Sequence, residues 1–178
     1  MTDVASHGIR GRSSSPWSRP VALPRTSGRP SLASSSYDVV HDLERAVAYY
    51  ERLGVGPWFD YPKGDAYVDF EVPNREASES TRYKCADLEN VQVQLCQPPS
   101  TPPSPQRAFL DAHGEGVYHL GFEVSDRDRA ETEARTLGLR VTARGKRADG
   151  SGFSYFDTYA GAGVTLEIRK TPARSSQG

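Results

Sequence analysis

Four polar residues, each in a run of alternating apolar and polar residues, form a candidate metal site. His119 begins the run 119–124, an alternation typical of a strand with two different faces. Gln94 lies in VQVQLCQP, Glu167 in VTLEIRKTP and Ser35 in SSSYDVV. One nitrogen and two oxygen donors suit a divalent first-row ion such as Zn, Mn, Co, Ni or Fe, and the Ser35 hydroxyl would add a weak ligand, directly or through water.

The body of the chain contains the same unit twice. Asp42 and Asp126 are 84 positions apart, and so are Gly54 and Gly138. A constant offset of this kind indicates an internal duplication. Each Asp fits the N-cap of a helix and each Gly fits its C-terminal cap, so the offset predicts two equivalent helices.

The duplication also relates the candidate ligands to one another. An offset of 84 carries His119 onto Ser35, and the final run of each unit aligns Gln94 with Glu167 at an offset of 73. If the two units face each other, all four side chains point into one cavity. Two alternatives remain open: His119 can be a hydrogen-bonded structural histidine, and Gln94 and Glu167 can face solvent on half-exposed strands.

Each unit is expected to contain a strand, a helix and three further strands. The first unit covers residues 32–99 and the second covers residues 116–170. The linker 100–115 begins with prolines that cannot continue a strand. His113, beside glycine in this linker, is expected in a solvent-facing turn. Further strand candidates are YVDFEV and TRYKCA in the first unit and FSYFD in the second.

The composition limits the classes of partner and compartment. The 178 residues carry a net charge of -1, which gives no reason to expect nucleic acid or an anionic membrane surface as a partner. No apolar run reaches the roughly 18 to 20 residues that span a bilayer. Two cysteines are too few for a disulfide framework, so we expect a cytoplasmic protein with reduced thiols. The segments 1–31 and 171–178 are expected to be a disordered N-terminal tail and a flexible C-terminal tail.

Several segments resemble the vicinal oxygen chelate superfamily, which includes glyoxalase I, bleomycin-resistance proteins, extradiol dioxygenases and methylmalonyl-CoA epimerase. The segments are DLERAVAYYERLGVGPW, VQVQLCQP, FLDAHGEGVYHLGFEVSD and GVTLEI, and they are most similar to the epimerase-like and glyoxalase-like branch. The resemblance implies an α+β fold of two tandem βαβββ modules that form a cupped, mixed and mostly antiparallel barrel around a metal site. We also expect a homodimer that binds a small-molecule substrate.

The resemblance supports three of the four candidate ligands. His119 matches the histidine of the second module, Glu167 the glutamate of the last strand, and Gln94 a position where relatives carry Glu or Gln. Ser35 departs from the pattern, because that position usually holds His or Gln. Water or substrate could fill the gap, or the metal has been lost.

The expected catalytic groups are Glu167 and Lys84. The epimerases place a glutamate on the third strand of the first module, where TRYKCA offers no carboxylate. Lys84 could act as a base with a lowered pKa near a metal, or with Arg82 it could bind an anionic substrate group. A solvated strand edge is equally compatible with both residues.

Two functions follow from these residues. The first is a metal-dependent isomerase, epimerase or lyase that moves a proton next to a carbonyl group. The second is a metal-free protein that sequesters an antibiotic or aromatic metabolite between aromatic walls, with Tyr37, Trp58 and Tyr155 among the substrate-binding residues. Dioxygenase activity fits less well, because a serine replaces one expected histidine.

Overall fold

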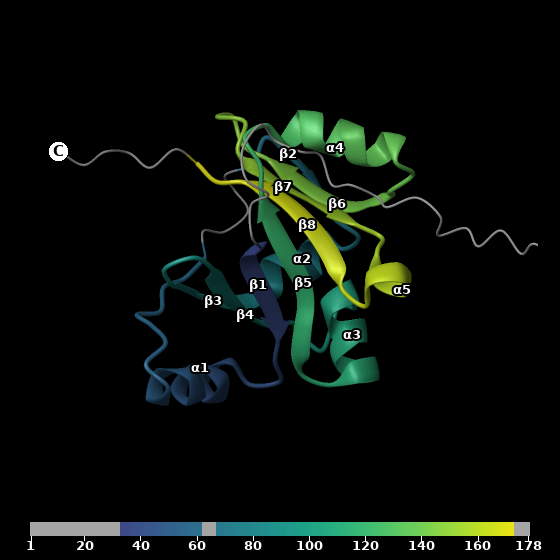
Figure 1. Cartoon of the computed structure of the whole chain (residues 1–178). Coiled ribbons are helices and arrows are strands. Elements are labelled where there is room, and N and C mark those ends of the chain that lie inside the picture. The colour runs from purple at the N-terminus through teal and green to yellow at the C-terminus, as the bar shows by residue number, and fades with distance from the viewer. Residues whose placement is uncertain (1–32, 62–66, 173–178) are drawn as a thin grey trace, which may run out of the picture.

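Two similar halves share one curved sheet in the computed structural model, which describes residues 33–61 and 67–172 (Figure 1). The segments 1–31 and 171–178, which are predicted to be tails, lie almost wholly outside these residues. The predicted α+β fold of two tandem modules is confirmed. The strands are β1 (Ala33–Val39), β2 (Asp69–Glu71), β3 (Arg82–Asp87), β4 (Gln92–Gln97), β5 (Gly116–Glu123), β6 (Val141–Lys146), β7 (Gly152–Phe156) and β8 (Thr165–Lys170).

The sheet has the strand order β2-β6-β7-β8-β5-β1-β4-β3. In each module the first and last strands pair in parallel, β1 with β4 and β5 with β8. The two modules join through the antiparallel pair β1–β5. The sheet is cupped and open, because its end strands β2 and β3 do not pair with each other within the described ranges. The expected cup is therefore present, and its sheet is not a closed barrel.

The duplication is visible in the two long helices of the modules. Helix α1 (Leu43–Arg52) and helix α4 (Arg127–Thr136) have first and last residues 84 positions apart. Asp42 and Asp126 cap them, each accepting a hydrogen bond of 3.0 Å from the backbone N–H three residues on. Gly54 and Gly138 follow the helices with φ of 84° and 87°, a left-handed conformation that favours glycine. The predicted helices and caps are confirmed.

The two helices pack on the sheet by different means. Leu43 of α1 is buried with Val93 and Leu95 of β4. Arg127, the equivalent of Leu43, is also buried, and its guanidinium donates to Glu131 and to Ser154 of β7. Thus an apolar contact in the first module is replaced by a buried ion pair in the second.

Strand β2 crosses from the first module to the second. Phe59 forms a bridge with Cys85 at the edge of β3. Asp69 then pairs with Lys146 of β6, so the predicted strand YVDFEV adds to the sheet of the second module. This pairing could not be read from the alternation, which gives a strand but not its neighbour.

Three short helices and one strand were not assigned precisely by sequence. Helices α2 (Arg75–Ser80) and α5 (Tyr159–Ala162) and strand β6 had no specific prediction. The linker folds into α3 (Pro105–His113), which is capped by Ser104. His113 is exposed, as expected, but it ends this helix rather than lying in the turn. None of the helices in the described ranges is long and apolar enough to cross a membrane.

Candidate metal centre

His119 and Glu167 meet in the buried interior of the cup. The Nε2 atom of His119 lies 3.1 Å from Oε2 of Glu167, and their side chains are only 1% and 7% exposed. Neither atom has a hydrogen-bond partner in the described part of the chain, so the contact lacks hydrogen-bond geometry. The Ser35 hydroxyl oxygen is also buried without a partner. Unpaired buried polar atoms are costly, and a shared cation would satisfy all three.

The register of the strands explains why Ser35 and Glu167 approach each other. Gly121 of β5 lies between them, paired with Ser35 of β1 and with Glu167 of β8. A methyl group on Gly121 would lie 2.2 Å from Oγ of Ser35 and 2.4 Å from Oε2 of Glu167. The missing side chain therefore creates the space in which the two oxygens meet.

Two tyrosine rings enclose the imidazole of His119. Tyr37 stacks on it with ring centroids 4.3 Å apart and an angle of 20°, and Tyr155 lies 4.7 Å away. The Tyr37 hydroxyl donates to the Cys96 sulfur over 2.7 Å. Burial raises the pKa of both tyrosines well above the usual value, so both phenols remain protonated.

Gln94 lies in the same row of the sheet as His119, with Tyr37 between them. Its amide nitrogen donates to Oε1 of Gln92 over 2.5 Å, and the same oxygen accepts from Arg169 over 3.2 Å. This arrangement orients the amide of Gln94 and leaves its own oxygen available. Gln94 is thus on the same face of the sheet as His119, one strand further from it than Ser35 and Glu167.

The donor set fits a divalent cation of borderline hardness. Within the described ranges, no three His, Cys, Asp or Glu side chains lie close enough to hold an ion by themselves. His119 and Glu167 would therefore need neutral oxygens, which Ser35 and Gln94 can supply. One imidazole, one carboxylate and such oxygens match the preferences of Mn, Fe, Co, Ni or Zn.

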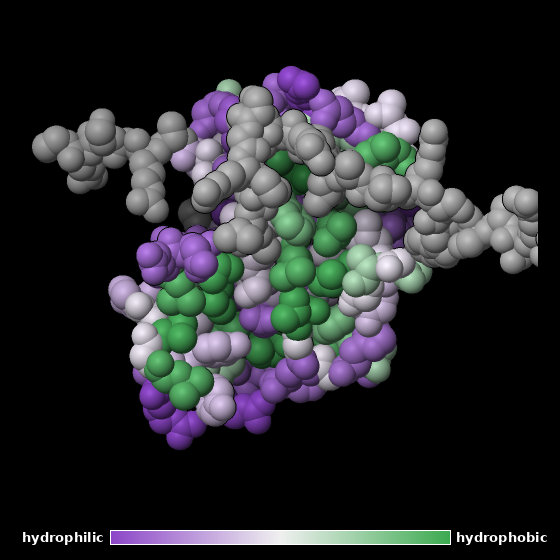
Figure 2. All heavy atoms as spheres, viewed as in Figure 1, coloured by the Kyte–Doolittle hydropathy of each residue, from purple (hydrophilic) through white to green (hydrophobic). Residues whose placement is uncertain are grey.

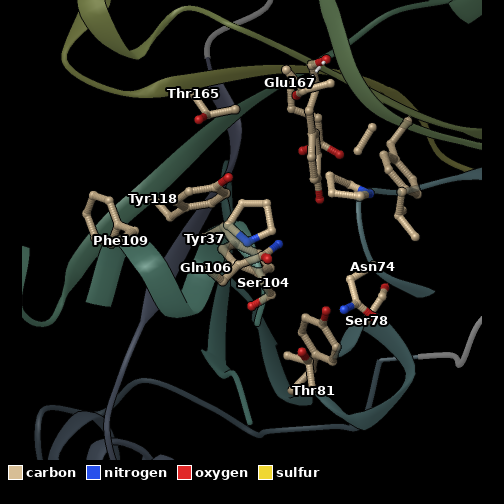
Figure 3. A pocket seen from close by; sticks show the side chains of 18 of the residues that line it. Tyr37, Asn74, Ser78, Thr81, Ser104, Gln106, Phe109, Tyr118, Thr165 and Glu167 are labelled. Atoms are coloured by element: carbon tan, nitrogen blue, oxygen red, sulfur yellow. Dashed lines mark hydrogen bonds between the residues drawn. The ribbon is translucent and has the colours of Figure 1, made fainter. Parts of the chain in front are cut away.

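Glu167 and Gln94 border a large cavity of about 1560 Å³. In Figure 3, Glu167 and Thr165 lie across the open space from Asn74, Ser78 and Thr81. Phe109 and Tyr118 form another side of the cavity, and helix α3 carries the first of these (Figure 3). The cavity is therefore built from both modules and from the linker between them.

Three other predicted site residues lie away from the His119–Glu167 pair. Trp58 packs against Tyr50 on the side of the sheet covered by α1 and is not among the described residues that border the cavity, so its role in substrate binding stays a prediction. Lys84 and Arg82 of β3 border the cavity, and each is held in an ion pair, Lys84 with Asp60 over 2.9 Å and Arg82 with Glu44.

A family comparison agrees with this architecture. Residues 39–156 match the profile of the Glyoxalase/Bleomycin resistance protein/Dioxygenase superfamily. The match covers more than half of the chain. The chain belongs to this superfamily.

Solved structures show that this superfamily member shares its fold with epimerases. Methylmalonyl-CoA epimerase from Mycobacterium tuberculosis matches with a TM-score of 0.61 and 21% identity, over 85% of this chain and 95% of the epimerase. A variant of the Streptomyces coelicolor epimerase, in complex with 2-nitronate-propionyl-CoA, matches with a TM-score of 0.60 and 23% identity, over 81% and 99% of the two chains. A hypothetical protein from Bacillus halodurans matches with a TM-score of 0.60 and 14% identity, over 81% and 96%. No curated protein sequence gives a significant match.

Sequence reasoning did not single out Gly121 or the pair Gln92–Arg169. Gly121 carried a usable signal, because glycine inside a strand often marks a close approach of other atoms. Gln92 lies two residues before Gln94 and on the same face of the strand. Its partner Arg169 is 77 positions away in the sequence, so no local pattern relates Gln92 to Arg169.

Proposed function

We propose that this protein is a metal-dependent enzyme of the isomerase, epimerase or lyase type, which moves a proton next to a carbonyl group of a small molecule. The observation that carries the proposal is the buried pair His119–Glu167. Its facing atoms lie 3.1 Å apart and have no hydrogen-bond partner among the described residues. They lie beside the Ser35 hydroxyl, which is unpaired in the same ranges, and Glu167 borders a cavity large enough for a substrate. Such convergence of unpaired polar atoms at a cavity is typical of a functional site.

His119 and Glu167 would hold the ion, with Ser35 as a weak or water-mediated ligand and Gln94 as the fourth. When bound, a divalent ion supplies Lewis acidity that stabilises negative charge on a carbonyl or enolate oxygen. Glu167 faces the cavity and is our candidate for the group that accepts the proton from carbon. Tyr155 also faces the cavity, and its protonated phenol can donate a hydrogen bond to a substrate oxygen.

Lys84 is not assigned a catalytic role in this proposal. Its ammonium group already pairs with Asp60, and its register partner is Leu95 of β4, so its side chain leaves the sheet on the face opposite to that of Tyr83. We therefore expect the Lys84→Gln variant to keep its activity.

The test combines metal binding with proton exchange. Metal-stripped protein is titrated with Mn²⁺, Co²⁺, Ni²⁺ and Zn²⁺, and deuterium uptake next to the carbonyl is followed for a panel of ketones and thioesters. Methylmalonyl-CoA belongs in the panel because it names the enzyme of the structural neighbours. We expect His119→Ala and Glu167→Gln to lose metal binding and exchange. The exposed residues His41 and Glu89 supply matched controls, His41→Ala and Glu89→Gln.

Exchange that persists unchanged in Glu167→Gln, or that needs no metal, would contradict the proposal.

A second candidate function is metal-free binding of a small molecule. Two observations favour it: a serine, Ser35, occupies one of the expected ligand positions, and aromatic rings line the cavity. Tight ligand binding by protein that takes up none of these metals would support that function instead.

A further inference from the structure

The cavity wall contains an almost continuous series of aromatic rings that passes over His119. Tyr67, two residues before β2, stacks on Phe70 of β2 at 5.2 Å, and Phe153 of β7 meets Tyr67 at 5.7 Å and Tyr155 at 4.9 Å. Tyr155 contacts His119, which completes one half of the series. The rings therefore extend from the edge of the second module to the candidate metal centre.

The series continues on the other side of His119. Tyr37 stacks on the imidazole, Tyr118 lies 6.1 Å from Tyr37, and Phe109 of α3 meets Tyr118 edge-on at 5.5 Å. Phe109 and Tyr118 face the open space in Figure 3. A ligand that reaches Glu167 therefore lies beside aromatic faces and edges on both sides.

A glycine makes room for the first group of rings. A methyl group on Gly145 of β6 would lie 2.5 Å from the ring of Phe153 and 2.9 Å from that of Tyr67. The rings of Tyr67 and Phe153 therefore depend on the absence of a side chain at this position. This close packing shows that the aromatic wall is built by the fold and is not a chance exposure of single rings.

Uncharged polar groups line part of the cavity wall. Helix α2 and its flanks contribute Asn74, Ser78 and Thr81, which face the open space opposite Thr165 (Figure 3). Ser104 and Gln106 add a hydroxyl and an amide at the start of α3. These groups can donate to and accept from hydroxyl and carbonyl groups, but they offer no charge to a carboxylate or phosphate.

Each cation of the wall already has an acidic partner. Four arginine and lysine residues border the cavity in the described ranges, and each forms an ion pair within the chain: Arg75 with Glu79, Arg82 with Glu44, Lys84 with Asp60 and Arg140 with Asp157. The side chains of Arg75, Arg82 and Arg140 are more than half exposed. The carboxylate of Glu167 faces the cavity and disfavours a second negative charge beside it.

From this distribution of rings and charges we propose that the cavity selects an uncharged, ring-containing carbonyl compound with hydroxyl or carbonyl substituents, and disfavours carboxylate- or phosphate-bearing substrates. The inference rests on the proposed function for the reacting carbonyl. The ring and charge preferences stand on the cavity wall alone. These preferences differ from the substrate that the names of the structural neighbours suggest, which is a CoA thioester with a free carboxylate.

The test compares an uncharged ketone with its carboxylate analogue, which differs by one charge, and with a CoA thioester that carries several negative charges. Binding of 2-acetylnaphthalene, 6-acetyl-2-naphthoate and methylmalonyl-CoA to the metal-stripped full chain is measured by tyrosine and tryptophan fluorescence and by calorimetry. We expect 2-acetylnaphthalene to bind at least tenfold more tightly than either anion. Equal or tighter binding of an anion, or no binding of the uncharged ketone, would overturn the inference.

Variants test the two parts of the wall separately. Phe70→Ala and Phe109→Ala, at the two ends of the ring series, are expected to weaken binding of the uncharged ketone at least fivefold, while Tyr49→Ala, on the exposed surface of α1, has no effect. Arg140→Gln should change its Kd less than twofold, and a larger loss would contradict the charge argument. Unfolding curves confirm that each variant is folded, and the comparison of ligands on the unmodified chain does not depend on them.

The outcome is separable from that of the proposed function. If metal-stripped protein binds the uncharged ketone but no metal restores deuterium exchange, the ligand class holds and the enzyme proposal fails. If exchange occurs only with methylmalonyl-CoA, the enzyme proposal holds and the ligand class is wrong.

Discussion

Gly121 and Glu167 are register partners on neighbouring strands, and the missing side chain of the first provides the space for the carboxylate of the second. We expect Gly121→Ala to displace Oε2 of Glu167 and to weaken metal binding at least tenfold. Gly116→Ala is the matched control, because it lies on the same strand and a methyl group there meets no atom within 4 Å. Titration of metal-stripped protein by calorimetry distinguishes the two, and equal affinities would show that the space beside Glu167 is not used.

Replacing Ser35 measures how much a neutral hydroxyl contributes to metal affinity at the same centre. The oxygen is buried without a hydrogen-bond partner in the described part of the chain, so its removal leaves no new unpaired group. We expect Ser35→Ala to weaken metal binding by only about threefold, the size of a single modest polar interaction. A loss as large as that of Glu167→Gln would instead make Ser35 a principal ligand.

The ion pair Arg127–Glu131 is expected to be costly to break from one side. Glu131 is 7% exposed and accepts from Arg127 over 3.1 Å and from Ser154 over 2.6 Å. We expect Glu131→Gln to lower the free energy of unfolding by about 3 kcal/mol, because the buried guanidinium of Arg127 loses its buried partner and keeps only the half-exposed carboxylate of Asp128. The exposed pair Arg129–Glu133 on the same helix supplies the control, and Glu133→Gln should cost about 0.5 kcal/mol or less.

The double variant Arg127→Leu/Glu131→Val copies the equivalent residues of the first module, Leu43 and Val47. Because apolar residues can replace a buried ion pair at little cost, the double variant should be more stable than either single variant. Urea unfolding of the three variants measures the order. A double variant that is the least stable of the three would show that the ion pair is required by the packing around α4.

The lowered pKa of the Glu131 carboxyl predicts that the stability of the fold depends on pH. Burial alone would raise the pKa of this carboxyl, but hydrogen bonds from Ser154 and Arg135 and the charge of Arg127 lower it overall. A carboxyl whose folded-state pKa is depressed stabilises the fold above its unfolded value of about 4.3, and this stabilisation disappears as the pH falls through the folded value. The difference in unfolding free energy between wild type and Glu131→Gln should therefore be full at pH 6 and shrink below pH 4. A difference that grows on acidification would contradict the assignment.

The two cysteines should be unreactive in the folded protein. Cys85 and Cys96 are fully buried, and burial raises the pKa of the Cys85 thiol to about 12 and that of Cys96 well above its usual value. Because the thiolate is the reactive form, iodoacetamide at pH 8 should label both residues in urea and neither in buffer. Mass spectrometry after a timed reaction gives the two rates, and fast labelling in buffer would show that the interior opens.

Much of the fold could be predicted from local pattern and repetition. Asp42, Asp126 and the glycines 84 positions apart bound both long helices, since capping depends on a few neighbouring residues. Alternation correctly placed β4, β5 and β8, and the offset related Ser35 to His119. The pairing of β2 with β6 was not predictable, because a strand pattern does not specify which neighbour forms its hydrogen bonds.

The candidate site divides in the same way. The residue types and spacing of His119 and Glu167 indicated a shared metal site, and this remains a prediction about binding that the experiments above test. Tertiary structure decided which other residues accompany them, because sheet register is a long-range property. It placed Gly121 between two oxygens, Trp58 under α1, and Lys84 beside Asp60. It also assembled one aromatic wall from β2, α3 and β7, of which only Tyr155 of β7 was expected at the cavity.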